Sequence, residues 1–349
     1  MLARKEAIRG NFLSLQEKDS VLREKAEIAN EINLDFLLGT YEFLPKMVKA
    51  RIGTGVADNY VRGRPEDEML EIDEIAENFE IDIIEKSAKN YGVSVEVFSE
   101  HNKYLIGPGN PDFRIALDPF DNSHEYKQGG RRKYGGLNVT PHFVIGIYDL
   151  DNNPLCAGDG DLVYKTFVIN YDGHNYYYDP TAKKTIPIEM PPQITTIKDP
   201  QFELATYDGD YDYSSQFNKY LHKLLKEKGG KVHGKAGAHI YRYLATGAAN
   251  AYAIFKEPRG EIDPGLPIAL SAGYTASSVN PDGTFEKYEF DPKLYYESVP
   301  FFVVASTNEL RDMIISYYVK GVPLSEKIIF IAKKKAKNVA STIFDRKAA

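Results

Sequence analysis

Residues 113–123 constrain the fold of this chain more than any other stretch. The apolar run at 113–117 predicts a buried strand, and it leads directly into Leu-Asp-Pro-Phe-Asp-Asn-Ser at 117–123. Pro119 lacks the amide hydrogen that a sheet ladder needs, so we expect the strand to bend there. A bend at this point would allow the side chains of Asp118 and Asp121 to approach the same spot.

Two close carboxylates repel each other unless a cation lies between them. Oxygen ligands of this kind suit Mg²⁺, which also keeps waters and substrate phosphate oxygens in its shell. Asn122 and Ser123 come next and indicate a helix start, whose free amide groups favour phosphate. The segment therefore predicts a magnesium site beside a phosphate cradle; the alternative from these residues alone is an Asp-rich turn with a capping side chain.

Composition narrows the function classes. The chain has 349 residues with 43% hydrophobic and 27% charged residues, which is typical of a globular protein of one large or two moderate domains. A net charge of −7 argues against general nucleic-acid binding. Cys156 is the one cysteine, so no disulfide framework is expected. The charged start at 1–9 and the lack of a long apolar run predict a cytoplasmic protein with no membrane span.

Hydrophobic periodicity predicts a helix at 19–38 and a second helix, marked by Ile75, Phe79 and Ile83, that ends near Tyr91-Gly92. A loop is predicted at 51–72. Strands are predicted at 93–98, 113–117, 143–148, 162–169, 174–178, 251–255 and 300–305, with a Gly173 hairpin and a helix around 241–248. Strands come first in a run and later alternate with helices, which favours an α+β half followed by an α/β half. We expect subdomains at 1–190 and 191–320 and a Lys-rich helical tail at 321–349, a solvated surface helix.

The hexapeptide at 118–123, Asp-Pro-Phe-Asp-Asn-Ser, resembles the Asp-Pro-(Ile/Leu)-Asp-Gly-Thr motif of the inositol monophosphatase and fructose bisphosphatase superfamily. These are Mg²⁺-dependent, lithium-sensitive phosphatases. The resemblance extends over roughly residues 20 to 318 and rests on three further features. It implies a layered α-β-α-β-α sandwich with the active site between the two halves.

Two of these features lie upstream of the hexapeptide. The family has a Gly-Glu-Glu element before the strand that leads to its Asp pair, and here Ser99-Glu100-His101 occupies the matching place. The family also has an acid about two dozen positions earlier, at the head of a helix, and Glu77 has that spacing from Glu100. Alternatively, both acids are solvated surface groups.

The third feature lies in the C-terminal half. Gly-Lys-Ala-Gly-Ala at 234–238 and Ala-Thr-Gly-Ala-Ala-Asn-Ala-Tyr at 245–252 resemble the family's Gly-x-Ala-Ala and Ala-x-Gly-x-x-Asp-Ala-Tyr segments. Glu261-Ile262-Asp263 follows where the family has Trp-Asp. By this alignment Asp263 is the last metal ligand; its alternative role is a helix N-cap.

The sequence departs from the family pattern at several positions. Asn122 replaces a glycine, Ser123 replaces a threonine but keeps the hydroxyl, and Ile262 replaces the Trp. Ile254 stands where inositol phosphatases have a substrate-binding Glu, which puts inositol in doubt as the substrate.

The resemblance implies a role for each matched residue. Glu100, Asp118 and the carbonyl of Phe120 would hold one Mg²⁺, and Asp118, Asp121 and Asp263 a second, with two or three ions in all. Glu77 and Ser123 would orient and deprotonate the attacking water. The amides near Asn122 and Ser123 would bind the phosphate.

A basic, glycine-flanked loop at 127–136 lies outside the family pattern. Arg131, Arg132 and Lys133 are either solvated or a clamp on a second phosphate or polar tail of the substrate.

The sequence therefore predicts Mg²⁺-dependent hydrolysis of a small phosphate monoester, such as a sugar phosphate or bisphosphate or an inositol phosphate. One alternative is a phosphoadenosine phosphate as the substrate. Another is a catalytically silent relative that binds a phosphorylated ligand or partner. A small phosphorylated metabolite is the expected partner, with a homodimer possible.

Overall fold

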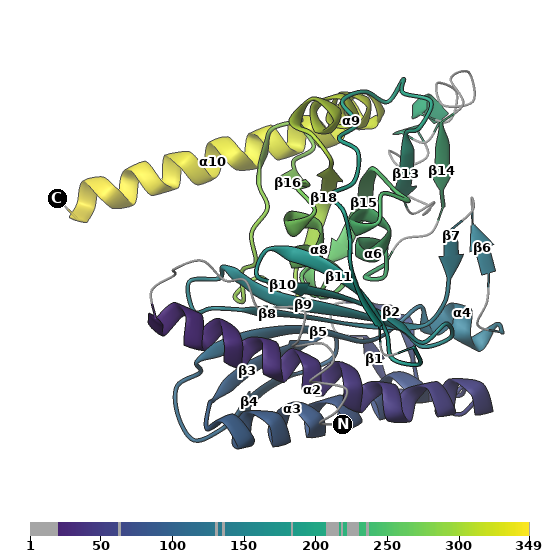
Figure 1. Cartoon of the computed structure of the whole chain (residues 1–349). Coiled ribbons are helices and arrows are strands. Elements are labelled where there is room, and N and C mark those ends of the chain that lie inside the picture. Colours follow the sequence, from purple (N-terminus) through teal and green to yellow (C-terminus); the bar gives the residue numbers. More distant parts are fainter. Residues whose placement is uncertain are drawn as a thin grey trace.

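The structure is a computed structural model. It describes residues 20–61, 64–129, 132–134, 137–182, 184–206, 216–217, 219–221, 230–234 and 237–348. Within this part of the chain, helices and two large sheets are stacked in alternating layers (Figure 1). The predicted mixed α/β sandwich is thereby confirmed.

The first sheet has eight strands among the described residues, in the order β12-β11-β10-β9-β8-β5-β3-β4. In that order they are Lys184–Pro187, His174–Asp179, Thr166–Tyr171, Pro154–Asp161, His142–Tyr148, Phe113–Asp121, Val95–Ser99 and Lys103–Ile106. Only β3 and β5 pair in parallel. The other neighbours are antiparallel. All of these pairs except β5 with β8 join strands that are consecutive in the chain.

The second sheet has six described strands in the order β14-β13-β15-β18-β16-β17. They are Lys231–His233, Glu203–Thr206, Ala251–Pro258, Ser298–Ala305, Thr275–Val279 and Phe285–Lys287. The pairs of β13 with β14 and β15 are parallel and the rest are antiparallel. The sheets therefore divide between Pro187 and Glu203, while the predicted subdomain boundary at 190 stays a prediction.

The helices form three layers around the sheets (Figure 1). The outer pair α2 (Ser20–Ala50) and α3 (Glu71–Tyr91) covers the first sheet, and α9 (Asn308–Gly321) covers the second. Between the sheets lie the short helices α6 (Ile240–Ala245), α7 (Arg259–Ile262) and α8 (Leu266–Ser271). The polar ends of these middle-layer helices can therefore meet strand ends of the first sheet.

Close packing of α2 on β9 depends on a glycine. A Cβ on Gly158 would lie 2.7 Å from side-chain atoms of Asn33 and Leu37 of α2. The sequence Pro-Leu-Cys-Ala-Gly-Asp-Gly-Asp of β9 lacks the apolar alternation of a strand, which is why it was not predicted. The segment from Leu162 to Lys165, predicted as part of a strand, is instead the turn between β9 and β10.

Two other predictions need correction. The expected loop at 51–72 contains a hairpin, β1 (Val56–Val61) with β2 (Arg64–Leu70). The first helix also continues past residue 38, through Pro45, to Ala50. Two further short strands, β6 (Arg132–Tyr134) and β7 (Leu137–Val139), pair beyond the short helix α4 (Ser123–Lys127).

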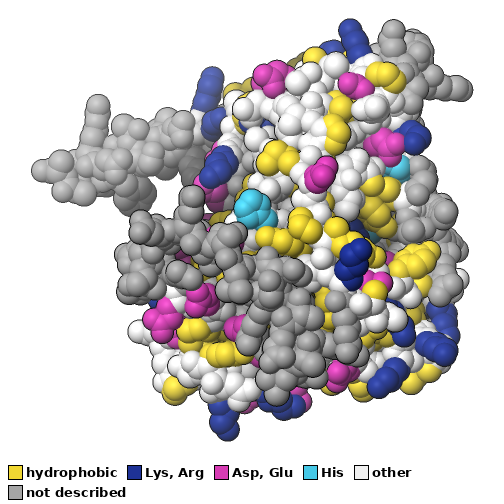
Figure 2. Space-filling view, in the orientation of Figure 1, with side chains coloured by type: hydrophobic (Ala, Val, Ile, Leu, Met, Phe, Trp, Pro, Cys, Tyr) yellow, Lys and Arg dark blue, Asp and Glu magenta, His cyan; other side chains and the backbone are white. Residues whose placement is uncertain are grey.

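Within the predicted tail, α10 (Leu324–Ala348) is one continuous helix that extends away from the layers (Figure 1). On the face shown in Figure 2, described side chains of both charge signs are interspersed. None of the described helices combines the length and apolarity needed to cross a bilayer.

Glu80 is an anomaly in the packing of α3. Its side chain is fully buried, and neither carboxylate oxygen has a hydrogen-bond partner among the described residues. Burial, and then the charge of Glu77, raise the pKa of Glu80 well above its usual value. Since the folded state favours the protonated form, this residue costs stability as the pH rises above the pKa of an unfolded glutamate.

We therefore expect Glu80→Met to raise the free energy of unfolding by about 1–3 kcal/mol at pH 8, with a smaller gain at pH 4. Urea denaturation at the two pH values measures this. Glu85→Met, at an exposed position of the same helix, should change stability little at either pH. A loss of stability in Glu80→Met at pH 8 would contradict the assignment.

Candidate metal centre

Three carboxylates converge where the first sheet meets the middle helices. Asp118 and Asp121 come from the end of β5, and Glu261 comes from α7. One oxygen of each lies within 4.8 Å of the others. The pairing of β5 with β8 is interrupted between Asp118 and Asp121, so the bend expected at Pro119 is present and aims both side chains at one point.

Two further acids, Glu100 and Asp73, lie near this group. Burial raises the pKa of Asp118 well above its usual value, and the negative charges of Asp121, Glu261, Glu100 and Asp73 raise it further. Glu100 follows β3, and Gly260 packs beside it, where a Cβ would stand 3.6 Å from the Cα of Glu100. This contact brings α7 and its Glu261 against the turn that carries Glu100.

The arrangement fits a divalent cation. Oδ2 of Asp118 is buried and has no hydrogen-bond partner among the described residues. Carboxylates gathered in a mostly buried space repel one another, and a hard cation with oxygen ligands would offset that cost. Asp118, Asp121, Glu261 and Glu100 are the residues that would hold it.

Asp263, the predicted last ligand, does not belong to this group of three, and its role as a ligand stays a prediction. Its Oδ1 accepts a 2.8 Å hydrogen bond from the hydroxyl of Tyr288, and its main-chain oxygen accepts one of 2.5 Å from Tyr148. The carboxylate that lies beside Asp118 and Asp121 is that of Glu261, two residues earlier. Glu261 lies inside the matched Glu-Ile-Asp segment, but the family pattern has its acid at the Asp position.

Two acids of α3 lie near the centre, and the predicted role of Glu77 stays a prediction. Glu77 accepts a hydrogen bond of 3.1 Å from Tyr104. Asp73, one turn earlier, is the acid beside Ser123. Burial raises the pKa of Asp73 well above its usual value; the Leu70 amide, 2.7 Å from Oδ2, and the Ser123 hydroxyl oppose the rise.

The turn between the Asp pair and α4 explains one departure from the family pattern. Asn122 has φ of 65°, in the left-handed region that glycine adopts most easily and that Asn tolerates better than other residues. A glycine at this position is thus replaced by the next most suitable kind of residue. The predicted start of a helix at Ser123 is confirmed, but α4 has only five residues.

Phe120 is buried, and its ring packs edge-on to Tyr126 of α4 with centroids 5.2 Å apart. No hydrogen bond or ion tests the predicted role of the Phe120 carbonyl, which stays a prediction. Arg131 lies outside the described residues, and so do the side chains of Arg132 and Lys133. Their predicted substrate contact is therefore untested.

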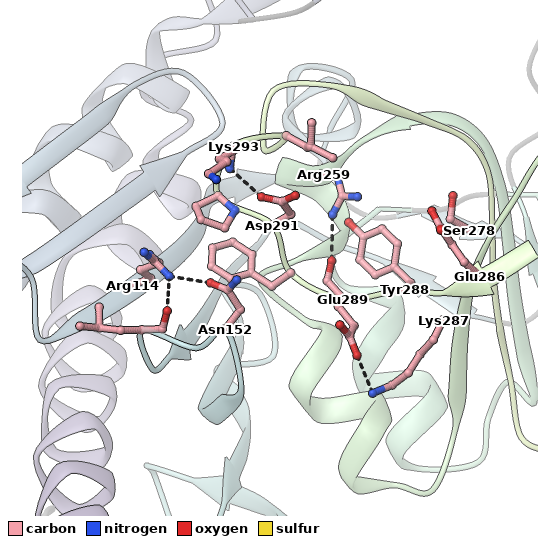
Figure 3. Close-up of a pocket in the computed structure, with 14 residues that line it drawn as sticks. Arg114, Asn152, Arg259, Ser278, Glu286, Lys287, Tyr288, Glu289, Asp291 and Lys293 are labelled. Atoms are coloured by element: carbon pink, nitrogen blue, oxygen red, sulfur yellow. Dashed lines mark hydrogen bonds and ion pairs between the residues drawn. The ribbon is translucent and has the colours of Figure 1, made fainter. Parts of the chain in front are cut away.

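Residues that line a polar groove of about 530 Å³ anchor helix α7. Arg259 donates a 3.0 Å hydrogen bond to the carbonyl of Glu289, and its guanidinium lies 4.6 Å from the ring centre of Tyr288 (Figure 3). Because Tyr288 also bonds Asp263, both ends of the 259–263 segment are fixed. Glu261 lies between these anchors.

A buried charged network joins the two halves beside the centre. Asp121, His142, Asp161 and Thr166 face one another across neighbouring strands β5, β8, β9 and β10. The side chain of His142 lies 2.7 Å from Oδ1 of Asp159.

Arg242 of α6 completes this network from the other half. Its NH1 lies 3.3 Å from Oδ1 of Asp159 and 3.7 Å from Oδ2 of Asp161, and NH2 donates to Thr166 at 3.0 Å. Burial alone would raise the pKa of Asp161, but the charges of His142 and Arg242 hold it below its usual value. Sequence reasoning missed this network because its members come from five separate elements of the chain.

Comparison with known proteins gives a fold but no sequence match. No family model matches the chain, and no curated protein does. Solved structures do match. The Thermotoga maritima IMPase is 14% identical with a TM-score of 0.57, over 83% of this chain and 97% of that one.

Two more structures give the same result. The extragenic suppressor protein suhB of Bartonella henselae is 12% identical with a TM-score of 0.57, over 83% and 99% of the two chains. Inositol monophosphatase II of Staphylococcus aureus is 16% identical with a TM-score of 0.56, over 86% and 97%. The chain therefore has the fold of the inositol monophosphatases, at low sequence identity.

Removal of the arginine from the buried network should be costly. We expect Arg242→Met to lower the free energy of unfolding by about 3–5 kcal/mol, because Asp159 and Asp161 stay buried without their cation. Lys231→Met, which breaks an exposed ion pair with Glu203, should cost less than about 1 kcal/mol. Equal losses in the two variants, measured by urea denaturation, would show that the network does not stabilise the junction.

Proposed function

We propose that this chain is a metal-dependent phosphatase that hydrolyses a phosphate monoester of a small molecule. The observation that supports it most is the convergence of Asp118, Asp121 and Glu261, of which one carboxylate oxygen each lies within 4.8 Å of the others. Glu100 and Asp73 are near enough to raise the pKa of Asp118 as well. A divalent cation would offset the repulsion in such a group, which lies in a fold shared with known inositol monophosphatases.

The chain's own residues supply the remaining parts of a hydrolytic site. A bound Mg²⁺ would neutralise charge on the phosphoryl oxygens and make a water molecule more acidic. Asp73 lies beside Ser123, so the Ser123 hydroxyl can orient the attacking water and Asp73 can accept its proton. The amides near Asn122 and Ser123 are the proposed contacts to the phosphate, although a helix as short as α4 contributes little dipole.

The substrate class stays broad. Among the structurally similar proteins, SaIMPase-II has been solved with inositol monophosphate bound and with 2'AMP bound. The buried Ile254, where inositol phosphatases have a polar substrate contact, disfavours inositol. A test panel should therefore include sugar monophosphates and bisphosphates, inositol phosphate and phosphoadenosine phosphate.

The central test compares two acids two residues apart. Phosphate release from the panel, with and without Mg²⁺, should show metal-dependent turnover in the wild type and inhibition by Li⁺ at millimolar levels. Glu261→Gln and Asp118→Asn should lower kcat by several orders of magnitude, because each removes a metal-facing charge. Asp263→Asn should retain turnover within about tenfold, because its carboxylate faces Tyr288.

The reverse order, with Asp263→Asn inactive and Glu261→Gln active, would restore the ligand set predicted from the sequence. Absence of release from every substrate by the folded wild type, with Mg²⁺ present, would favour the catalytically silent alternative.

A second comparison tests the base. We expect Asp73→Asn to lower kcat by about 10²–10⁴-fold, the usual contribution of a general base, with little change in KM. Glu77→Gln should have a much smaller effect, since Glu77 bonds Tyr104. Phosphate release at saturating substrate measures both. If Glu77→Gln is the more damaging change, the water is oriented from the later turn of α3.

A further inference from the structure

The two oxygens of Asp121 have different surroundings. Oδ2 lies 2.7 Å from the main-chain nitrogen of His239, 2.7 Å from its ring Nδ1, and 3.0 Å from the side-chain nitrogen of Asn122. Hydrogen bonds from several donors use the lone pairs of this one oxygen. Oδ2 is therefore held by the protein itself.

Oδ1 is kept open by a glycine. Gly237 has φ of 147°, and a Cβ at this position would lie only 2.4 Å from Oδ1 of Asp121. Any side chain at residue 237 would collide with Oδ1 of Asp121, the oxygen that the hydrogen bonds to Oδ2 do not use. Oδ1 is thus the oxygen of Asp121 with room to coordinate.

The contact with Asp121 assigns a hydrogen to Nδ1 of His239, and the Asn122 side-chain nitrogen also lies 2.9 Å from this atom. The two N–H groups of the Asn122 amide donate to the Thr140 carbonyl, at 3.1 Å, and to Oδ2 of Asp121. An ionised carboxylate only accepts hydrogen bonds, so the short contact with Nδ1 requires that Nδ1 carries a hydrogen. This donor is present whether the imidazole is neutral or charged.

His239 itself has little freedom to move. It is fully buried immediately before α6, and its ring lies 5.4 Å from that of His142, centre to centre. His142 is in turn held by Asp159, to which Arg242 is paired. The buried network therefore supports the ring that bonds Asp121.

We propose that His239 is a positioning residue for the metal centre: with Asn122 it clamps Oδ2 of Asp121, so that only Oδ1 is presented to a divalent cation. The clamp joins the halves, because Asp121 and Asn122 come from the first and His239 from the second. The inference rests on the proposed function. It also accounts for Asn122, whose side chain adds a donor that a glycine would lack.

The test is a titration with Mn²⁺ alone, with the free ion followed by electron paramagnetic resonance. Partners of ligating carboxylates typically change metal affinity 10- to 100-fold. His239→Leu keeps the main-chain donor, so we expect affinity to fall by about tenfold, the lower end of that range. His239→Asn carries an N–H on the atom bonded to Cγ, as His does at Nδ1, and should bind within about threefold of the wild type.

A second buried histidine provides the control. His233 is 1% exposed and lies 2.9 Å from a carboxylate oxygen of Glu203, in the second sheet. His233→Leu removes the same kind of contact and should leave Mn²⁺ affinity unchanged, while circular dichroism confirms that each variant is folded.

Two results would overturn the inference in different ways. Equal Mn²⁺ affinity in folded His239→Leu and in the wild type would exclude the clamp and leave the metal centre intact. A wild-type chain that binds no Mn²⁺ would exclude the metal centre, and the clamp with it.

Discussion

Repulsion among carboxylates at one point is the constraint on which the rest of this structure depends. Asp118 is buried among acids from three other segments: α3, the turn after β3, and α7. No packing of apolar side chains removes such a cost, because the free energy is electrostatic and grows as water is excluded. Much of the surrounding structure holds these carboxylates in place against their mutual repulsion. The Arg259–Tyr288–Asp263 contacts anchor α7, and the gap in pairing after Asp118 turns the strand end inward.

The junction between the two halves of the chain is polar beside this group of carboxylates. Sheet strands supply Asp121, His142, Asp159 and Asp161, while the segment at α6 supplies His239 and Arg242. A junction of buried charges is a weak source of net stability but it tolerates few alternative packings. Such a junction suits a site whose residues come from both the first sheet and the middle helices and must keep fixed hydrogen-bond distances. The glycine at 237 serves the same purpose, because the chain passes close to Asp121.

Sequence reasoning reached the layered fold through the family resemblance of the motif, and it reached several single elements through local signals. The apolar run before Asp118, the Gly92 helix end and the turn at Gly173 each require only neighbouring residues. It missed β9 because the glycines and acids at 158–161 suit contacts with α2 and Arg242 and do not follow the apolar alternation of a strand. It predicted Glu77 and Asp263 from spacing and residue type, and their roles stay predictions. The structure places an oxygen of Glu261 within 4.8 Å of oxygens of Asp118 and Asp121, and it places Asp73 beside Ser123. A displacement of two or four residues along a helix decides which carboxylate faces the centre, and a single sequence does not encode that choice locally.

The most direct test of the metal centre is crystallographic. Crystals soaked in Mn²⁺ should give an anomalous difference peak within coordination distance of carboxylate oxygens from Asp118, Asp121 and Glu261. The peak nearest Asp121 should lie on its Oδ1 side, away from His239 and Asn122. A map with no peak among these three residues, or with its strongest peak at the carboxylate of Asp263, would contradict the account.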